Sequence, residues 1–325
     1  MNGASNSQIL SDCSADTLAV AAKALKEGAL VAFPTETVYG LGADASNESA
    51  VARIYEAKGR PADHPLIVHI ASMEDISLWS KEIPIYAISL ARDFWPGPMT
   101  LVLSRSEIAK DFITGGQESV ALRVPAHSIA LGLLRAFRSQ GGFGIAAPSA
   151  NRFGQVSPTT AEAVEEEIGI HLASKDYILD GGPSMVGVES TIIDCTKELP
   201  RILRPGAITV EMIEESTGLK VVKDSTTEIR VSGSLENHYS PKARITLDAL
   251  AEQGEGFIAP SSISTPEGAI RLASPKSVDD YARDLYAALR AADAQGIATI
   301  AVIQPEGDGL ALAIRDRLLR ASRGR

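Results

Sequence analysis

Short apolar runs alternate with amphipathic segments along residues 14–216, and this alternation predicts helices packed on a sheet. Apolar residues at helical spacing predict helices over residues 14–28, 47–57, 84–94, 127–138, 159–168 and 209–216. Apolar runs of strand length predict strands at 29–33, 66–70, 99–104, 119–124, 143–147, 177–180, 190–194 and 200–203. A short polar turn separates the last two strands, so we expect that pair to be antiparallel and the sheet to be mixed.

Residues 217–243 differ in character from the segments on either side. They are polar, rich in Ser, Thr and Gly, and end near the run His-Tyr-Ser-Pro, which predicts a linker. Beyond it, a second α/β pattern predicts strands at 243–247, 256–259, 269–273 and 298–303, a helix between the last two of these, and a final helix over 309–321. We therefore expect an α/β protein with a larger unit at 10–216, the linker at 217–243 and a smaller α/β unit at 244–325.

The composition is that of an ordinary globular protein: 325 residues, 45% hydrophobic and 22% charged, a length typical of about two domains. No apolar run approaches the roughly 18 residues that a membrane span needs, and residues 1–8 lack the pattern of a signal peptide. Cys13 and Cys195 are too few and too far apart for a disulfide framework or a zinc site. We expect a cytoplasmic protein with two thiols and no membrane contact.

Charge is distributed unevenly along the chain. The formal net charge is −10, and residues 1–215 hold 17 Lys and Arg against 27 Asp and Glu, whereas residues 216–325 hold 14 of each class. The acidic part of the chain is nevertheless the part that carries the basic motifs. This pattern favours a local anion pocket, and it predicts weak or no direct binding of tRNA, because broad nucleic-acid binding needs a basic face.

Short polar or basic motifs lie at or beside the ends of the predicted elements of the larger unit. They occupy residues 34–42, 58–61, 64–69, 95–100, 123–125, 147–151 and 203–206. The first is the densest, because Pro-Thr-Glu-Thr-Val-Tyr-Gly-Leu-Gly places two hydroxyls, a carboxylate, a phenol and two glycines directly after a buried strand. Together the motifs predict one anion-binding site assembled from many strand ends.

Four cations are candidates for that site. Lys58 and Arg60 end a predicted helix, where they could simply cap its dipole. Arg123 and Arg204 lie at the ends of predicted strands, Arg204 directly before a proline and Arg123 two residues before one, where each could be a salt bridge at the rim. Taken together they favour a shared anionic ligand, because guanidinium groups bind phosphate or carboxylate in a bidentate manner.

The loop after residue 147 offers neutral polar groups. Ser149 and Asn151 supply a hydroxyl and an amide, and the run Ser-Pro-Thr-Thr from Ser157 then opens a helix whose N-terminus could hold an anion. The alternative is a plain N-cap by Ser157 or Thr159. Because no P-loop, dinucleotide fingerprint or Gly-x-Ser-x-Gly motif is present, a nucleotide would bind outside the common phosphate loops.

The order of these motifs resembles that of the YrdC-like domains. The linker run His-Tyr-Ser-Pro and the tail Ala-Ile-Arg-Asp-Arg are similar to the longer, two-domain form, the threonylcarbamoyl-AMP synthases. The resemblance implies an open, twisted mixed sheet with helices and a smaller Rossmann-like C-terminal domain. The related hydrogenase-maturation carbamoyltransferases carry further segments for which this chain has no room. Outside the superfamily, a non-catalytic RNA-binding groove is the main alternative, and a pure scaffold would leave the polar motifs unexplained.

The resemblance also implies a reaction. L-threonine, bicarbonate and ATP would give threonylcarbamoyl-AMP, pyrophosphate and water, with Mg²⁺ on the triphosphate and no organic cofactor. A tRNA threonylcarbamoyl transferase would then use the product to modify the adenosine beside the anticodon. Close positioning of three reactants suffices for this chemistry, and no covalent nucleophile is expected.

Site residues follow from the matching motifs. The resemblance implies that threonine and its carbamate are held by Thr35, His69, Arg123 and Ser190. It implies that ATP is held by Lys58, Arg60, Ser149, Asn151, Ser157, Arg204 and Tyr239, the last as part of a lid over the site. Two residues depart from the family pattern: Phe153 replaces a small polar residue, and Asn237 replaces a basic one.

Overall fold

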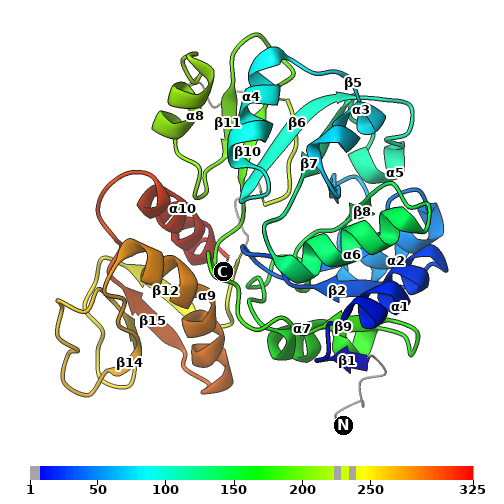
Figure 1. Cartoon of the computed structure of the whole chain (residues 1–325). Helices are drawn as coiled ribbons and strands as arrows, with labels where there is room; N and C mark the ends of the chain where they lie inside the picture. The colour runs from blue at the N-terminus through cyan, green and yellow to red at the C-terminus, as the bar shows by residue number, and fades with distance from the viewer. Residues whose placement is uncertain (1–7, 223–227, 234–238, 325) are drawn as a thin grey trace.

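The computed structural model describes residues 8–222, 228–233 and 239–324. Its described strands form two sheets (Figure 1). The larger sheet runs in the order β1 (Gln8–Leu10), β9 (Tyr177–Leu179), β2 (Val31–Phe33), β3 (Gly40–Asp44), β8 (Ile145–Ala146), β4 (Ile67–His69), β7 (Ser119–Arg123), β6 (Met99–Arg105), β10 (Thr191–Asp194) and β11 (Arg201–Arg204), and β5 (Ser80–Glu82) pairs with β6.

This sheet is mixed, as the sequence predicts. Strand β4 runs parallel to β7 and antiparallel to β8, and β10 runs parallel to β6 and antiparallel to β11. The helices of the larger unit are α1 (Ala15–Lys26), α2 (Glu48–Lys58), α3 (Ile76–Trp79), α4 (Ile85–Phe94), α5 (Asp111–Thr114), α6 (Ser128–Ser139), α7 (Ala161–Ile168) and α8 (Val210–Thr217), with 3-10 turns at Met73–Asp75 and Gly169–His171. Each predicted helix and strand is confirmed to within one or two residues at either end.

Alternate residues of the strands belong to two separate apolar clusters, because successive side chains of a strand point to opposite faces of the sheet. Val31 and Phe33 pack in one cluster with the apolar stripes of α1 and α6. Ala32 packs in the other, larger cluster, to which α2 and α4 contribute. The sheet is therefore covered on both faces, and its strand ends are left to form the site.

Strand β3 was not predicted. Residues 34–42 were predicted only as a dense polar motif that follows the strand at 29–33. In the structure this stretch turns back at once, and β3 pairs antiparallel with both β2 and β8, joining the two halves of the sheet. A Cβ on Gly42 would lie 2.7 Å from Ile145 Cγ2 and 2.8 Å from Phe33 Cε1, so the glycine allows the neighbouring side chains to close over the strand.

The smaller sheet is parallel throughout. Its order is β12 (Arg244–Leu247), β15 (Thr299–Val302), β13 (Gly256–Ile258) and β14 (Ile270–Ala273). Helices α9 (Val278–Ala294) and α10 (Leu310–Ser322) belong to this unit, which lies beside the larger one in Figure 1. A second α/β unit is therefore confirmed. Throughout the described ranges, no helix combines the length and the apolar character needed to cross a membrane.

Gly42→Ala should destabilise the fold by about 1–3 kcal/mol, because the added methyl overpacks the junction between the two halves of the sheet. Gly40→Ala is the matched control in the same strand, since its Cβ meets no atom closer than 3.3 Å. Urea unfolding of both variants measures the difference. Equal stability of the two variants would contradict the role given to Gly42.

Candidate functional site

One pocket lies where the ends of strands from the larger unit meet Ser232, Gly233 and Tyr239. It is lined by most of the residues singled out from the sequence: Thr35, Arg60, His69, Arg123, Ser149, Ser190, Arg204 and Tyr239. The rest of its wall consists of Thr37, Val38, Tyr39, Gly40, Ile67, Ala147, Pro148, Glu189, Ser232 and Gly233. Strand register explains part of this convergence, because His69 and Arg123 are direct partners at the carboxyl ends of parallel β4 and β7.

The loop after β2 is held by its own hydroxyl groups. Thr35 Oγ1 donates to the Val38 carbonyl at 2.6 Å and accepts from the backbone N–H groups of Thr37 and Val38, each at 3.2 Å. It also lies 2.8 Å from Thr37 Oγ1. The threonine-rich motif therefore builds a tight turn, and Thr35, Thr37 and Val38 of this turn line the pocket.

Arg123 shares a buried ion pair with Glu36. The Arg123 Nη2 to Glu36 Oε1 distance is 2.6 Å, and Glu36 Oε2 accepts from the Ala126 N–H at 3.0 Å. Arg123 Nε donates to the Gly97 carbonyl at 3.3 Å. Glu36 was not among the predicted site residues, and the only sequence signal for it was a single carboxylate within a dense polar motif.

Arg204 binds the chain segment that carries Ser190. Its Nε and Nη2 donate to the Ser190 carbonyl at 3.1 and 2.9 Å, and Nη2 also reaches Ser190 Oγ at 3.1 Å. Ser190 Oγ lies 2.7 Å from Thr100 Oγ1. Nη1 of Arg204 donates to the Ser232 carbonyl at 2.8 Å. Burial lowers the pKa of Arg204, so this cation depends on its acceptors and on any bound anion.

Arg60 also contacts Ser232. Its Nη2 donates to the Pro65 carbonyl at 2.9 Å and to Ser232 Oγ at 3.1 Å, and its buried Nε has no hydrogen-bond partner among the described residues. Burial lowers the pKa of Arg60 to about 10. The guanidinium lies 5.9 Å from the ring centre of Phe153, which packs outside the pocket wall and also contacts His64 edge-on.

Three predicted site residues lie behind the pocket wall. Lys58, buried at the end of α2, donates to the Ser149 carbonyl at 2.6 Å and also to the Asn151 carbonyl, and burial holds its pKa well below the usual range. Asn151 Nδ2 donates to the Gln155 carbonyl at 2.8 Å. Ser157 Oγ donates to Glu189 Oε1 at 2.7 Å. The alternative N-cap assignment was wrong, because Thr160 caps α7.

Two of the three described parts of residues 217–243 line the pocket. Ser232 and Gly233 line it from one segment and Tyr239 lines it from the other. Tyr239 has a φ of +63°, in the left-handed region, and a Cβ added to Gly233 would clash with the Tyr239 hydroxyl. The two segments therefore touch over the site. Asn237 and His238 lie outside the described residues.

Comparison with known proteins agrees with this architecture. A family model described as "Telomere recombination", for the Sua5, YciO and YrdC proteins, matches residues 23–206, and one described as "Threonylcarbamoyl-AMP synthase, C-terminal domain" matches residues 208–323. The threonylcarbamoyl-AMP synthase of Pyrococcus abyssi is 43% identical over 323 residues, with 93% of each chain covered. The chain belongs to the threonylcarbamoyl-AMP synthase family.

Other relatives support the same membership. The threonylcarbamoyl-AMP synthase of Bacillus subtilis is 38% identical, with 95% of this chain and 93% of the relative covered. The solved structure of P. abyssi Sua5 complexed with L-threonine superposes with a TM-score of 0.86 at 41% identity, covering 96% of each chain. The resemblance drawn from the motifs is confirmed, as is the two-unit α/β fold.

A second carboxylate of the pocket in this synthase-family chain was also missed from the sequence. Glu189 is buried next to Ser190, and its partners include Tyr286 and Arg317 of the C-terminal unit. Burial raises the pKa of Glu189, but the charges of Arg317 and Arg204 outweigh burial and bring it to about 2. Within the described part of the chain, no group of three or more His, Cys, Asp or Glu residues could hold a metal ion.

His69 is an uncharged polar group in the pocket wall. It is buried, its Nδ1 has no hydrogen-bond partner among the described residues, and its ring meets Phe33 edge-on with centres 5.7 Å apart. Burial, reinforced by the nearby Arg123 charge, lowers the pKa of His69 to about 3. At neutral pH the imidazole can therefore donate or accept one hydrogen bond to a ligand without adding charge.

This buried His69 should make stability depend on pH. A histidine of the unfolded chain takes up a proton near pH 6.5, whereas folded His69 resists protonation down to about pH 3, so protons favour unfolding. The free energy of unfolding should fall by about 1.4 kcal/mol for each pH unit below 6.5. Urea unfolding between about pH 7 and pH 5 should show a steeper loss in wild type than in His69→Gln. Parallel curves would contradict the assignment.

Proposed function

We propose that this protein is an L-threonylcarbamoyladenylate synthase, which condenses L-threonine, bicarbonate and ATP to threonylcarbamoyl-AMP with release of pyrophosphate and water. The observation that carries the proposal is the convergence of Arg60, Arg123 and Arg204 on one pocket, in a chain of this family. Three buried guanidinium groups suit ligands that carry several negative charges, and a nucleoside triphosphate with a threonine carboxylate fits that requirement.

We propose that ATP binds on the side formed by Arg60, Ser149 and Arg204. Lys58 and Asn151 would act from behind the wall, because the Lys58 ammonium donates to the backbone carbonyls of Ser149 and Asn151 and so shapes the loop that faces the ligand. Ser157 would act in a similar way through its hydrogen bond to Glu189, which lines the pocket.

Mg²⁺ would accompany the triphosphate and neutralise part of its charge. The carboxylates beside the pocket, Glu36 and Glu189, are each paired with an arginine. The ion would therefore be held chiefly by phosphate oxygens and water, which is its usual manner of binding beside nucleotides.

Threonine would bind on the side formed by Thr35, His69, Arg123 and Ser190. The Arg123 guanidinium is the natural partner of the threonine carboxylate, and its pairing with Glu36 holds it in place before the ligand arrives. The imidazole of His69 lies beside it and offers a hydrogen bond without a charge that would compete for the carboxylate.

The site would act by positioning rather than through a covalent nucleophile. The threonine amine attacks the carbon of bicarbonate and water leaves, which gives a carbamate. A carbamate oxygen then attacks the α-phosphorus of ATP, and pyrophosphate leaves. Holding the reactants in line removes much of the entropic barrier, and the fixed cations stabilise the charge that moves onto the pyrophosphate.

We further propose that residues 217–243 are a linker between a catalytic unit at 10–216 and a C-terminal unit at 244–325, and that Tyr239 belongs to a lid. The product is a mixed anhydride that water hydrolyses, so a closed site protects it. The product would pass in the cytoplasm to a tRNA threonylcarbamoyl transferase. The acidic balance of residues 1–215 supports weak or no binding of tRNA by this chain itself.

Pyrophosphate release from ATP should require both L-threonine and bicarbonate. Lys58→Ala and Arg204→Ala should each lower kcat/KM by about tenfold or more, because each removes charge-assisted hydrogen bonds in or behind the pocket wall. The exposed Lys81→Ala and Arg92→Ala serve as matched controls. Pyrophosphate release that does not depend on threonine would refute the proposed function. It would favour RNA binding or a different carbamoyl acceptor.

Tyr239→Ala should raise the ratio of free AMP to threonylcarbamoyl-AMP, because it removes the ring that closes the pocket. Tyr239→Phe keeps the ring stacked on Tyr286, with centres 5.8 Å apart, and should behave like wild type. Separation of the nucleotides by chromatography gives the ratio directly. An alanine variant with full rate and no extra AMP would rule out the lid.

A further inference from the structure

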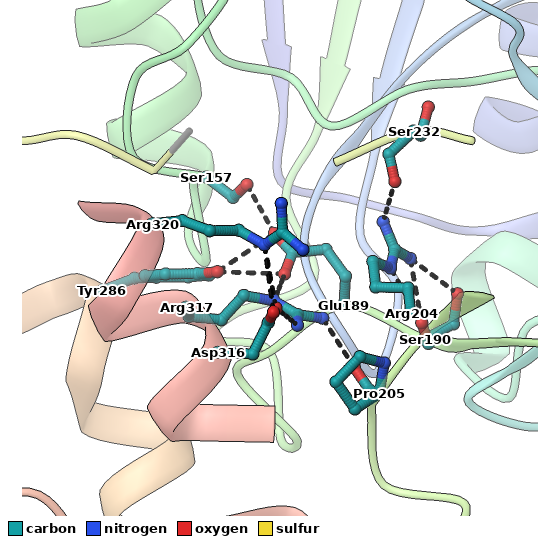
Figure 2. A network of polar contacts seen from close by, with 10 residues as sticks. All are labelled: Ser157, Glu189, Ser190, Arg204, Pro205, Ser232, Tyr286, Asp316, Arg317 and Arg320. Atoms are coloured by element: carbon teal, nitrogen blue, oxygen red, sulfur yellow. Dashed lines mark hydrogen bonds and ion pairs between the residues drawn. The ribbon is translucent and has the colours of Figure 1, made fainter. Parts of the chain in front are cut away.

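Glu189 is a pocket residue whose charge is balanced from the other unit of the protein. Figure 2 shows its carboxylate between Ser157 and side chains of α9 and α10. Tyr286 of α9 donates to Oε2 at 2.9 Å, and Arg317 of α10 donates from Nε to the same oxygen at 2.9 Å. A buried carboxylate is stable only when it is paired, so the state of this wall depends on the C-terminal unit.

Arg317 contacts three segments that carry pocket residues. Besides Glu189, its Nη2 donates to the Pro205 carbonyl at 3.0 Å, directly after Arg204. Its guanidinium also lies 5.4 Å from the ring centre of Tyr239. The side chain is buried, and Asp316 holds Nη1 at 2.7 Å (Figure 2). The Arg317 side chain of α10 therefore contacts the Glu189–Ser190 segment, the Arg204–Pro205 turn and Tyr239 at the same time.

We propose that Arg317 is a positioning residue for ATP, through which the C-terminal unit neutralises Glu189 and holds Tyr239 against the pocket. The inference rests on the proposed function for the identity of the ligand. The physical reason is electrostatic: without Arg317, Glu189 would lose its ion-pair partner. Its carboxylate would then lie in the wall that faces a polyanion, and like charges repel strongly where little water screens them.

Simple docking of the two units is the alternative role, and the chain supplies a matched control for it. Arg290 of α9 also bridges the units, through Glu167 at 3.2 Å and the Val156 carbonyl at 2.5 Å. Arg290 does not line the pocket. Loss of Arg290 therefore removes a comparable contact between the units without exposing a charge to the ligand.

The test is calorimetric binding of a non-hydrolysable ATP analogue, with Mg²⁺, to full-length wild type and variants. Arg317→Met should weaken binding by about tenfold or more, whereas Arg290→Met should stay within about twofold of wild type. Adding Glu189→Gln to Arg317→Met should recover most of the loss, since the unpaired charge is then gone. In turnover the KM for ATP should rise more than kcat falls.

Several outcomes would overturn the inference. They are analogue binding by Arg317→Met at the wild-type affinity, a loss in Arg290→Met as large as that in Arg317→Met, and a failure of Glu189→Gln to restore binding in the double variant. If Arg317→Met does not fold, Glu189→Gln alone decides: it should bind the analogue at least as tightly as wild type, and a tenfold loss would refute the charge argument. Wild type that binds the analogue but releases no pyrophosphate with threonine and bicarbonate would refute the proposed function instead, and wild type that binds none would refute both.

Discussion

Positive charge buried around one pocket is the constraint on which the rest of this structure depends. Arg60, Arg123 and Arg204 are between 3% and 7% exposed, and each would be costly to bury without acceptors. Nearby acceptors offset this cost. The three guanidinium groups donate hydrogen bonds to the carbonyls of Gly97, Pro65, Ser190 and Ser232 and to the Glu36 carboxylate. The guanidinium groups are thus held in place before any ligand binds, which is the arrangement that an electrostatic positioning site requires.

Two carboxylates keep this charge in balance, and they connect the pocket to distant parts of the chain. Glu36 pairs with Arg123 within the larger unit, whereas Glu189 pairs with Arg317, 128 residues away in α10. Ser232 and Tyr239 are held from both units, because the Ser232 carbonyl accepts from Arg204 and the Tyr239 ring stacks on Tyr286. The C-terminal unit is therefore part of the electrostatic environment of the site, although it supplies no side chain to the pocket wall.

The periodicity of the sequence predicted most of the fold, because both units consist of regular elements with clean apolar faces. It failed at β3, where glycines required by close packing against Phe33 and Ile145 look like loop residues. For the site, a cation at a strand end is visible in the sequence, as with Arg123 and Arg204. The direction in which a side chain points is not visible in the sequence. Lys58, Asn151 and Ser157 were therefore predicted to bind ATP directly, although they lie behind the pocket wall. Glu189 was missed because its partner Arg317 is adjacent only in three dimensions.

The proposed reaction can be tested by mass spectrometry of the product formed from ATP, L-threonine and ¹³C-labelled bicarbonate. We expect an adenylate that carries the label in its carbamoyl group, released together with pyrophosphate. Formation of AMP and pyrophosphate without an adenylate that contains both threonine and the label would contradict it, since the buried cations would then serve a different anionic ligand or a different reaction.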